Sequence, residues 1–126
     1  EEKVLIQNTT VSADKNPKYS TNPGNATTDK VFLLSINEVE KYFEAGKYII
    51  YKAKSCTPTA YAKALGAYTS TKGDTVTCSW WLRTPGYIQD YAASVDIEGS
   101  VIFAGHQVSN AIIFVCVRPA LWISIE

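Results

Sequence analysis

The chain has 126 residues, and its twelve Lys and Arg balance twelve Asp and Glu, so the formal net charge is zero. Nucleic-acid binders normally carry a basic patch or stripe, and the scattered charges here argue against a nucleic-acid partner. The longest apolar run, residues 111–117, is far shorter than the about 20 apolar residues of a transmembrane helix. We therefore expect one domain over residues 1–126, with no membrane-spanning segment.

The N-terminal quarter is dominated by polar residues. A short apolar run over residues 3–6 is followed by residues 7–30, which are rich in Asn, Thr, Ser and Pro. Asn22-Pro23-Gly24 in its second half is a turn signal. The sequence predicts a long polar loop over 7–30, and loops of this length inside a compact domain are usually functional or pack against another segment.

The next residues predict a buried strand and a helix. The strand is the apolar run 31–34. Ser35 stands three residues before Glu38, the spacing of a capping box, in which each side chain bonds the other residue's backbone amide. The helix is expected to end near Gly46 and to carry its apolar residues on one face: Ile36, Val39 and Phe43.

A second, shorter helix is predicted over residues 60–65. Thr57 is the expected N-cap, because a hydroxyl can accept a bond from an orphan amide of the first turn. Pro58 suits the first turn, since its missing N–H has no partner there in any case. Gly66 follows as the terminator.

The second half of the chain predicts strands. Residues 75–83 alternate in character, which places Val76, Cys78, Trp80 and Leu82 on one face. Strands over 91–97 and 100–104 flank a Glu98-Gly99 hairpin turn. A loop over 105–110 leads to a last strand over 111–118, stopped by Pro119. Two short helices and a small antiparallel sheet predict an α+β domain.

Four motifs resemble one bacterial family, the domain of unknown function numbered 6273. They are residues 29–35, residues 59–63, the Trp80-Trp81-Leu82-Arg83-Thr84-Pro85-Gly86 run, and the closing run 117–122. Thr84 replaces the usual Ser of the third motif, and Cys116 stands where a Gly is typical.

The resemblance implies a C-type-lectin-like fold and a protein secreted by, or attached to the surface of, a Gram-positive bacterium. Family members usually carry an upstream section with a WLN-like motif that is not found here. The resemblance therefore implies that the chain is the C-terminal two-thirds of the family domain.

The tryptophans and two arginines are interpreted as structural. Most tryptophans in small domains pack in the interior with a bonded indole, and we expect this of Trp80, Trp81 and Trp122. Buried charges need partners, so Arg83 and Arg118 are expected to tie down a loop or to pair with a carboxylate, such as Asp96 or Glu38.

The cysteines leave two interpretations open. Cys56 and Cys78 can form a disulfide that staples the second helix to the sheet, while Cys116 is expected to be a buried thiol. Alternatively, Cys78 or Cys56 serves with His106 as the nucleophile of a hydrolase or transferase. The sequence has no Cys-x-x-Cys and no pair of histidines, and we expect no metal and no cofactor.

The best candidate for a binding surface is a pair of loops rich in aromatic and amide groups. Sugars are held by stacking on aromatic faces and by hydrogen bonds to polar side chains. The candidate residues are Tyr87, Gln89, Asp90, Tyr91, His106, Gln107 and Asn110. We expect a non-catalytic, metal-independent recognition module for a glycan or a surface protein. Two alternatives remain. One is the Cys–His hydrolase or transferase described above, and the other is an assembly module that pairs with another chain or associates with itself.

Overall fold

The computed structural model describes residues 3–43, 54–109 and 114–126, and shows an α+β domain with small antiparallel sheets. Among these residues, strand pairs form three two-stranded sheets: β1 (Val4–Ile6) with β9 (Ile123–Ile125), β2 (Thr9–Val11) with β3 (Thr27–Asp29), and β4 (Thr69–Lys72) with β5 (Thr75–Cys78). A three-stranded sheet has the order β6 (Trp80–Pro85), β7 (Tyr91–Val95) and β8 (Val101–Gln107). The helices are α1 (Ile36–Phe43) and α3 (Ala60–Ala64).

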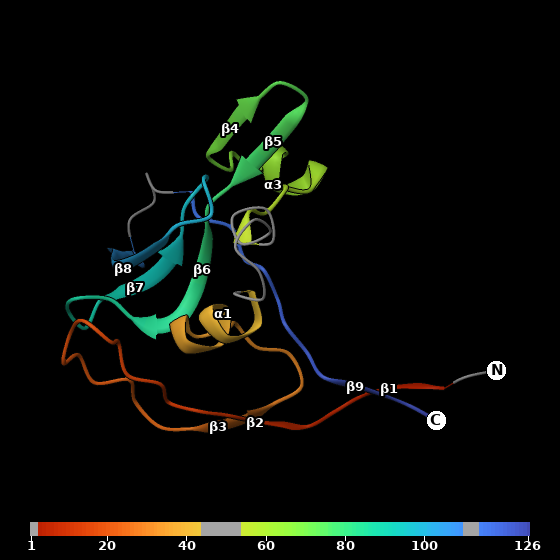
Figure 1. Cartoon of the computed structure of the whole chain (residues 1–126), viewed down its shortest axis with the longest axis vertical. Coiled ribbons are helices and arrows are strands. Elements are labelled where there is room, and N and C mark those ends of the chain that lie inside the picture. Colours follow the sequence, from red (N-terminus) through yellow and green to blue (C-terminus); the bar gives the residue numbers. More distant parts are fainter. Residues whose placement is uncertain (1–2, 44–53, 110–113) are drawn as a thin grey trace.

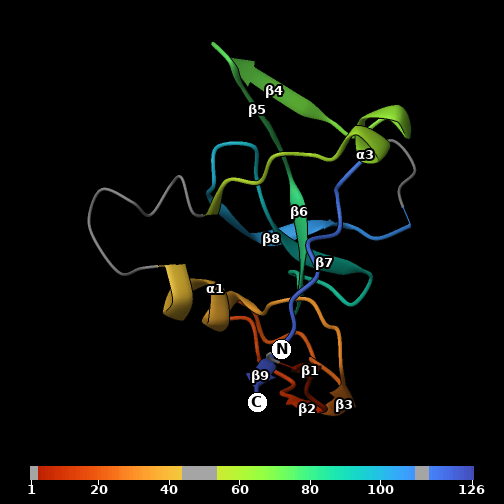
Figure 2. The same ribbon diagram turned by 90° about the vertical axis from the view of Figure 1, so that its right-hand side faces the viewer.

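The three-stranded sheet and α1 form the middle of an elongated molecule (Figure 1). Both views place α3 and the β4–β5 hairpin at one end, and the β2–β3 pair with the β1–β9 ribbon at the other (Figures 1 and 2). No helix among the described residues is long and apolar enough to cross a bilayer.

The core lies between α1 and the three-stranded sheet. The predicted alternation along β6 holds, because Trp80 and Leu82 are buried while Trp81 and Arg83 are only partly so. The residues that join them in the core come from α1 and β7: Ile36, Val39, Ala93 and Val95. Burying a side chain of this kind contributes on the order of 1.5–3 kcal/mol, so α1 is held chiefly by this face rather than by its own eight residues.

The capping box at the start of α1 is confirmed. The Ser35 hydroxyl accepts from the Glu38 amide at 3.2 Å, and the Glu38 carboxylate accepts from the Ser35 amide at 3.4 Å. A third group was not foreseen: the buried Thr84 hydroxyl accepts from the Ile36 amide at 2.9 Å. The helix start is therefore fixed to β6 by a hydrogen bond as well as by apolar packing. The predicted helix end at Gly46 lies outside the described residues.

Two predicted strands are wrong in their described parts. Residues 31–34 form only a single bridge, between Phe32 and Ala120, and Val31 is exposed. Residues 114–118 contribute one parallel bridge, between Cys116 and Trp80, because Cys116 bonds through its amide to Ser79 and through its carbonyl to Trp81. The strand predicted over 75–83 is divided into β5 and β6 at Ser79, whose carbonyl accepts from the Cys116 amide.

The predicted hairpin turn after β7 is present. Gly99 takes a φ of 85°, and the Asp96 carboxylate accepts from the amides of Glu98 and Ser100, both at 2.9 Å. Asp96 therefore stabilises the turn that connects β7 to β8, where we had expected a partner for an arginine.

The loop predicted over 105–110 is wrong for its first half, because β8 continues to Gln107. Gly105 has a φ of 70°, and a Cβ on it would lie 1.9 Å from the carbonyl oxygen of Ala92. The register of β7 against β8 shifts at this point. Gly105 is thus a bulge residue that lets the strand continue, although in sequence it signals a turn.

The predicted helix over 60–65 is present, one residue shorter, and its cap is Thr59 rather than Thr57. The Thr59 hydroxyl accepts from the Ala62 amide at 3.1 Å, and Thr59 has the extended backbone of a capping residue. Gly66 follows the helix with a φ of 93°, as a terminator does.

Candidate functional site

The polar segment predicted as a loop over 7–30 begins and ends in short strands and is bound to one end of the three-stranded sheet. Asn16, with 4% of its surface exposed, donates to the carbonyl oxygens of Pro85 at 2.9 Å and Phe103 at 2.7 Å. Its own carbonyl oxygen accepts from the Lys18 amide at 2.9 Å. The Thr21 hydroxyl adds a bond to the Gly86 carbonyl at 2.7 Å. The segment is therefore fixed beside the turn that follows β6.

This attachment creates a cluster of three tyrosine rings, which we name the tyrosine cluster: Tyr19, Tyr87 and Tyr91. The rings of Tyr87 and Tyr91 meet edge to face with centroids 4.8 Å apart, and Tyr19 meets Tyr87 at 6.2 Å. Tyr19 and Tyr87 are exposed to 38% and 44%, so they present aromatic surface to solvent. Hydrogen bonding with Tyr87 raises the pKa of Tyr91 above its ordinary value.

Amide and carboxylate groups border the tyrosine cluster. The Gln107 amide donates to the Asp90 carboxylate at 2.9 Å, and the Val108 amide donates to the Asp90 carbonyl at 3.0 Å. The Gln89 side chain reaches the carbonyl of Asn22 at 3.5 Å. The loop after β6 and the end of β8 are thus brought together, with polar groups that face solvent beside the exposed rings. Asn110 lies outside the described residues.

His106 belongs to a different face. It pairs with Ala92 across β7 and β8, while its neighbour Gln107 pairs with Tyr91, and neighbouring residues of a strand point to opposite sides. The His106 ring meets Trp81 edge to face at 6.4 Å. Trp81 is half-buried in this contact. Sequence reasoning grouped His106 with the tyrosines because it assigned both to loops.

The three tryptophans differ in their surroundings. Trp80 is fully buried, its indole N–H donates to the Lys54 carbonyl at 2.8 Å, and the Arg118 guanidinium lies 4.8 Å above its ring. Trp122 departs from the expected interior packing, because 51% of it is exposed. It lies next to the outermost strand pair rather than the core, where Tyr42 is its edge-to-face neighbour at 5.9 Å.

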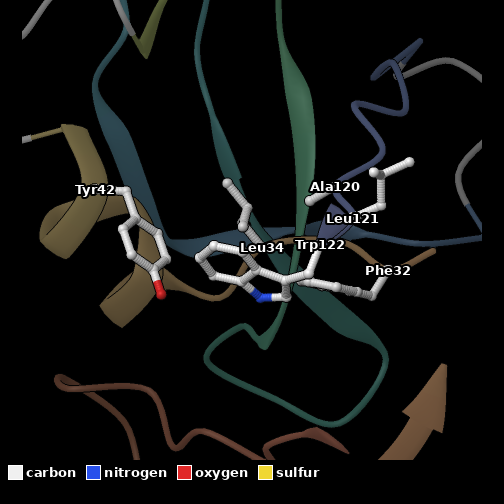
Figure 3. A pocket seen from close by; sticks show the side chains of 6 residues that line it. All are labelled: Phe32, Leu34, Tyr42, Ala120, Leu121 and Trp122. Atoms are coloured by element: carbon white, nitrogen blue, oxygen red, sulfur yellow. The ribbon is translucent and has the colours of Figure 1, made fainter. Parts of the chain in front are cut away.

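Trp122 lines a small apolar groove of about 150 Å³ (Figure 3). The figure shows its indole between the Tyr42 ring of α1 and the side chain of Phe32, with Leu34 behind. The complete lining is Phe32, Leu34, Tyr42, Ala120, Leu121 and Trp122. Its wall is mostly apolar, and the polar side-chain groups among the lining residues are the Tyr42 hydroxyl and the Trp122 indole N–H.

Arg83 connects β6 to two other stretches of the chain, the polar segment and the residues at the start of α1. Its guanidinium pairs with the Glu38 carboxylate, one of the partners foreseen, and lies 3.4 Å from the Asp14 carboxylate. It also donates to the carbonyl oxygens of Leu33 at 2.8 Å and Ser12 at 3.1 Å. Only 17% of the Arg83 side chain is exposed, so it holds the polar segment and α1 against β6 and leaves little surface for a ligand.

The cysteines converge on Cys78. The Cys78 amide bonds the Cys56 carbonyl at 2.8 Å, and its thiol contacts both Cys56 and Cys116. Cys116 is half-buried, whereas a buried thiol was expected. All three thiols are free in this structure, and a Cys56–Cys78 disulfide stays a prediction.

Burial, with smaller contributions from the neighbouring cysteines, raises the pKa of Cys78 to about 12, which leaves almost no thiolate near pH 7. The His106 ring contacts Trp81, whereas the Cys78 thiol contacts the other two cysteines, and the Cys–His nucleophile stays an untested alternative. Within residues 3–43, 54–109 and 114–126, no three His, Cys, Asp or Glu side chains come close enough to hold a metal ion.

Sequence reasoning missed the residues that assemble the site. Asn16 and Tyr19 lie in the polar segment, whose partners are about 70 residues further along the chain. Local periodicity contains no information about such contacts. The one available signal was composition: Tyr19 is the one aromatic residue among residues 7–30.

Comparison with known proteins gives one finding. Residues 1–125 match the model of a protein family described as a domain of unknown function, DUF6273. No curated protein and no solved structure matches the chain.

Proposed function

Because this chain belongs to the DUF6273 family, whose description names no activity, we propose a function from its own geometry: a non-catalytic module that recognises carbohydrate outside a bacterial cell. The observation that carries the proposal is the tyrosine cluster. Two exposed phenol rings from separate segments are held within 6.2 Å of each other and bordered by amide and carboxylate groups.

The chemistry of this surface suits a sugar. The apolar face of a pyranose stacks on an aromatic ring, and its hydroxyls pair with amide and carboxylate side chains. Asp90 offers a carboxylate and Gln107 offers an amide. Because these two side chains already bond each other, they are held in place before a ligand arrives. A preordered site loses less conformational freedom on binding.

Recognition by this surface requires no metal and no nucleophile. The groups beside the rings are phenols, amides and one carboxylate, which bind by hydrogen bonds and stacking. A surface protein that presents aromatic and polar side chains would use the same groups, and it is the alternative ligand for this site. The proposed C-type-lectin-like fold rests on the motif resemblance and on the long polar segment folded over the sheet end.

Binding to an array of host glycans and bacterial wall polysaccharides, with and without chelator, tests the proposal. We expect binding to one glycan class that chelator leaves unchanged. The variant Tyr87→Ala/Tyr91→Ala should weaken it at least ten-fold, which corresponds to about 1.4 kcal/mol. Tyr68→Ala is the matched control, because Tyr68 is 62% exposed and precedes β4 at the opposite end of the molecule (Figure 1).

Two results would contradict the proposal. Undiminished glycan binding by the double tyrosine variant would remove the tyrosine cluster from the function. Loss of binding in Trp122→Ala alone would move the site to the groove beside α1. An empty array, followed by binding of a surface protein that requires Tyr87 and Tyr91, would replace the carbohydrate ligand by the protein ligand.

A further inference from the structure

Three cysteines from separate stretches of the chain meet where β5 gives way to β6, and we name them the thiol cluster: Cys56, Cys78 and Cys116. Cys56 pairs with Cys78 in an antiparallel bridge, and the Cys78 amide donates to the Cys56 carbonyl at 2.8 Å. The Cys116 amide donates to the carbonyl of the next residue along, Ser79, at 2.9 Å. The Cys78 thiol is in hydrogen-bond contact with the thiols of both other cysteines. Cys78 is therefore the shared neighbour of two thiols.

The backbone places both pairs where a disulfide can form. Hydrogen-bonded pairs in antiparallel strands have Cα atoms about 5.5 Å apart, and a disulfide joins Cα atoms about 4.4–6.8 Å apart. The bridge between Cys56 and Cys78 meets this requirement. For Cys78 and Cys116, the contact between the thiols shows that the two side chains point toward each other. Neither pair has to be brought together from a distance.

We propose that the thiol cluster is a disulfide-exchange site, in which Cys78 forms a disulfide with either Cys56 or Cys116 and leaves the third thiol free. The two disulfides tie different segments to β5, because Cys56 precedes α3 whereas Cys116 belongs to the stretch after β8. Loop length does not select one of them. The two loops differ less than two-fold in length, and the probability of closure falls only as about the 3/2 power of loop length.

Oxidation of the thiol cluster requires an electron acceptor, for which we take a low-molecular-weight disulfide, RSSR. Cys56 and Cys116 are half-buried, whereas Cys78 is fully buried and burial raises the pKa of its thiol to about 12. The thiolate of Cys56 or Cys116 therefore attacks RSSR first, which gives a mixed disulfide and one RSH. Cys78 then attacks the protein sulfur of the mixed disulfide, loses its proton and releases the second RSH. Two protein thiols are oxidised to one disulfide, and RSSR is reduced to two RSH.

The third thiol carries out the exchange. When Cys56 is bonded to Cys78, the Cys116 thiolate attacks the Cys78 sulfur, an S–S bond forms between them, and Cys56 leaves as a thiolate that takes up a proton. This step consumes no oxidant. Cys78 remains bonded throughout and is never the leaving group. That role fits its high pKa, because thiols of low pKa leave faster.

The choice of disulfide changes which segment is held beside α3. Cys116 lines an apolar groove of about 350 Å³ together with Tyr61 and Leu65 of the α3 region and Phe114. A disulfide through Cys116 fixes the wall of this groove that comes from residues 114–117. A disulfide through Cys56 instead fixes the residues that lead into α3.

Oxidation of the 126-residue chain by oxidised glutathione tests the proposal. The chain is equilibrated with mixtures of oxidised and reduced glutathione, quenched with acid, alkylated and digested with trypsin. Cleavage after Lys63, Lys72 and Arg83 leaves each cysteine on its own peptide, so mass spectrometry quantifies each pairing. We expect one disulfide and one free thiol per chain, with the Cys56–Cys78 and Cys78–Cys116 forms within about ten-fold of each other.

Substitutions at the two half-buried positions are the matched variants. Cys116→Ser should form the Cys56–Cys78 disulfide and Cys56→Ser the Cys78–Cys116 disulfide, each at equilibrium within about ten-fold of the parent chain. Cys78→Ser should form neither and should accumulate mixed disulfides with glutathione. Circular dichroism shows whether each variant is folded. The parent chain in concentrated urea is a second comparison, and there the Cys56–Cys116 pairing should be at least ten-fold more abundant than in the folded chain.

Three results would overturn the proposal. The first is a folded parent chain that stays reduced in every glutathione mixture. The second is a parent chain that forms one pairing alone. The third is a Cys56–Cys116 disulfide as abundant in the folded chain as in urea. The tyrosine cluster contains no cysteine, so glycan binding is measured separately and stands or falls independently.

Discussion

Replacement of Asn16 by Ala tests how the polar segment is held. The side chain of Asn16 is almost fully buried and makes three hydrogen bonds, to the Pro85 and Phe103 carbonyls and to the Lys18 amide. Each such bond contributes about 1 kcal/mol net, and the groups left behind are buried polar atoms without partners. We therefore expect Asn16→Ala to lower the free energy of unfolding by about 3 kcal/mol.

Urea denaturation followed by circular dichroism measures this loss. Asn25→Ala is the control, because Asn25 is exposed in the same segment and its replacement should change stability by less than about 0.5 kcal/mol. Asn16→Asp should be no better than Asn16→Ala at neutral pH, since a carboxylate cannot donate to the two carbonyl groups. An Asn16→Ala protein as stable as the Asn25→Ala protein would refute the claim that Asn16 fixes the segment to the sheet.

Three further predictions concern β6, β8 and the cysteines. Thr84→Val should lower the free energy of unfolding by about 1–2 kcal/mol, because the first amide of α1 loses its acceptor. Thr84→Ser retains the hydroxyl and should keep most of the stability of the parent chain. Thermal melting of the two variants measures the difference. Gly105→Ala should cost more than about 2 kcal/mol by urea denaturation, because its Cβ would collide with the Ala92 carbonyl, whereas Gly24→Ala, also at positive φ but in open space, should cost less. Burial raises the pKa of the Cys78 thiol, so the folded state keeps this proton between about pH 9 and pH 12 while the unfolded state loses it. The free energy of unfolding should therefore fall as the pH rises through that window. Cys78→Ala should flatten this part of the pH–stability curve, and an unchanged slope would contradict the prediction.

Local features were predicted well from sequence, because their causes lie within a few residues. The Ser35–Glu38 capping box, the alternation along β6 and the turn at Gly99 each depend on neighbours in the chain. The α+β class follows from the same signals.

The tertiary placement of loops was not predictable in the same way. Tyr87 and Tyr91 were identified from composition, but Tyr19, which completes the cluster, was not, because Asn16 brings it there through bonds to residues far along the chain. Gly105 was taken as the start of a loop, since sequence does not distinguish a bulge glycine from a turn glycine.

Trp122 shows the limit of reasoning from residue type. Tryptophan is usually packed inside, yet half of Trp122 is exposed, because β9 pairs with β1 away from the three-stranded sheet. Pairing between the two ends of a chain is a long-range event that no window of residues reveals.

Nuclear magnetic resonance mapping shows whether a sugar binds at the tyrosine cluster or at the groove beside Trp122. Soluble fragments of the polysaccharide selected on the array are titrated into the 126-residue chain, and the shifts of its backbone amides are followed. We expect the perturbed amides to gather at residues 19–22, 87–91 and 107, and the Trp122 indole N–H to stay unperturbed. Shifts confined to the groove around Trp122, with residues 87–91 unmoved, would contradict it.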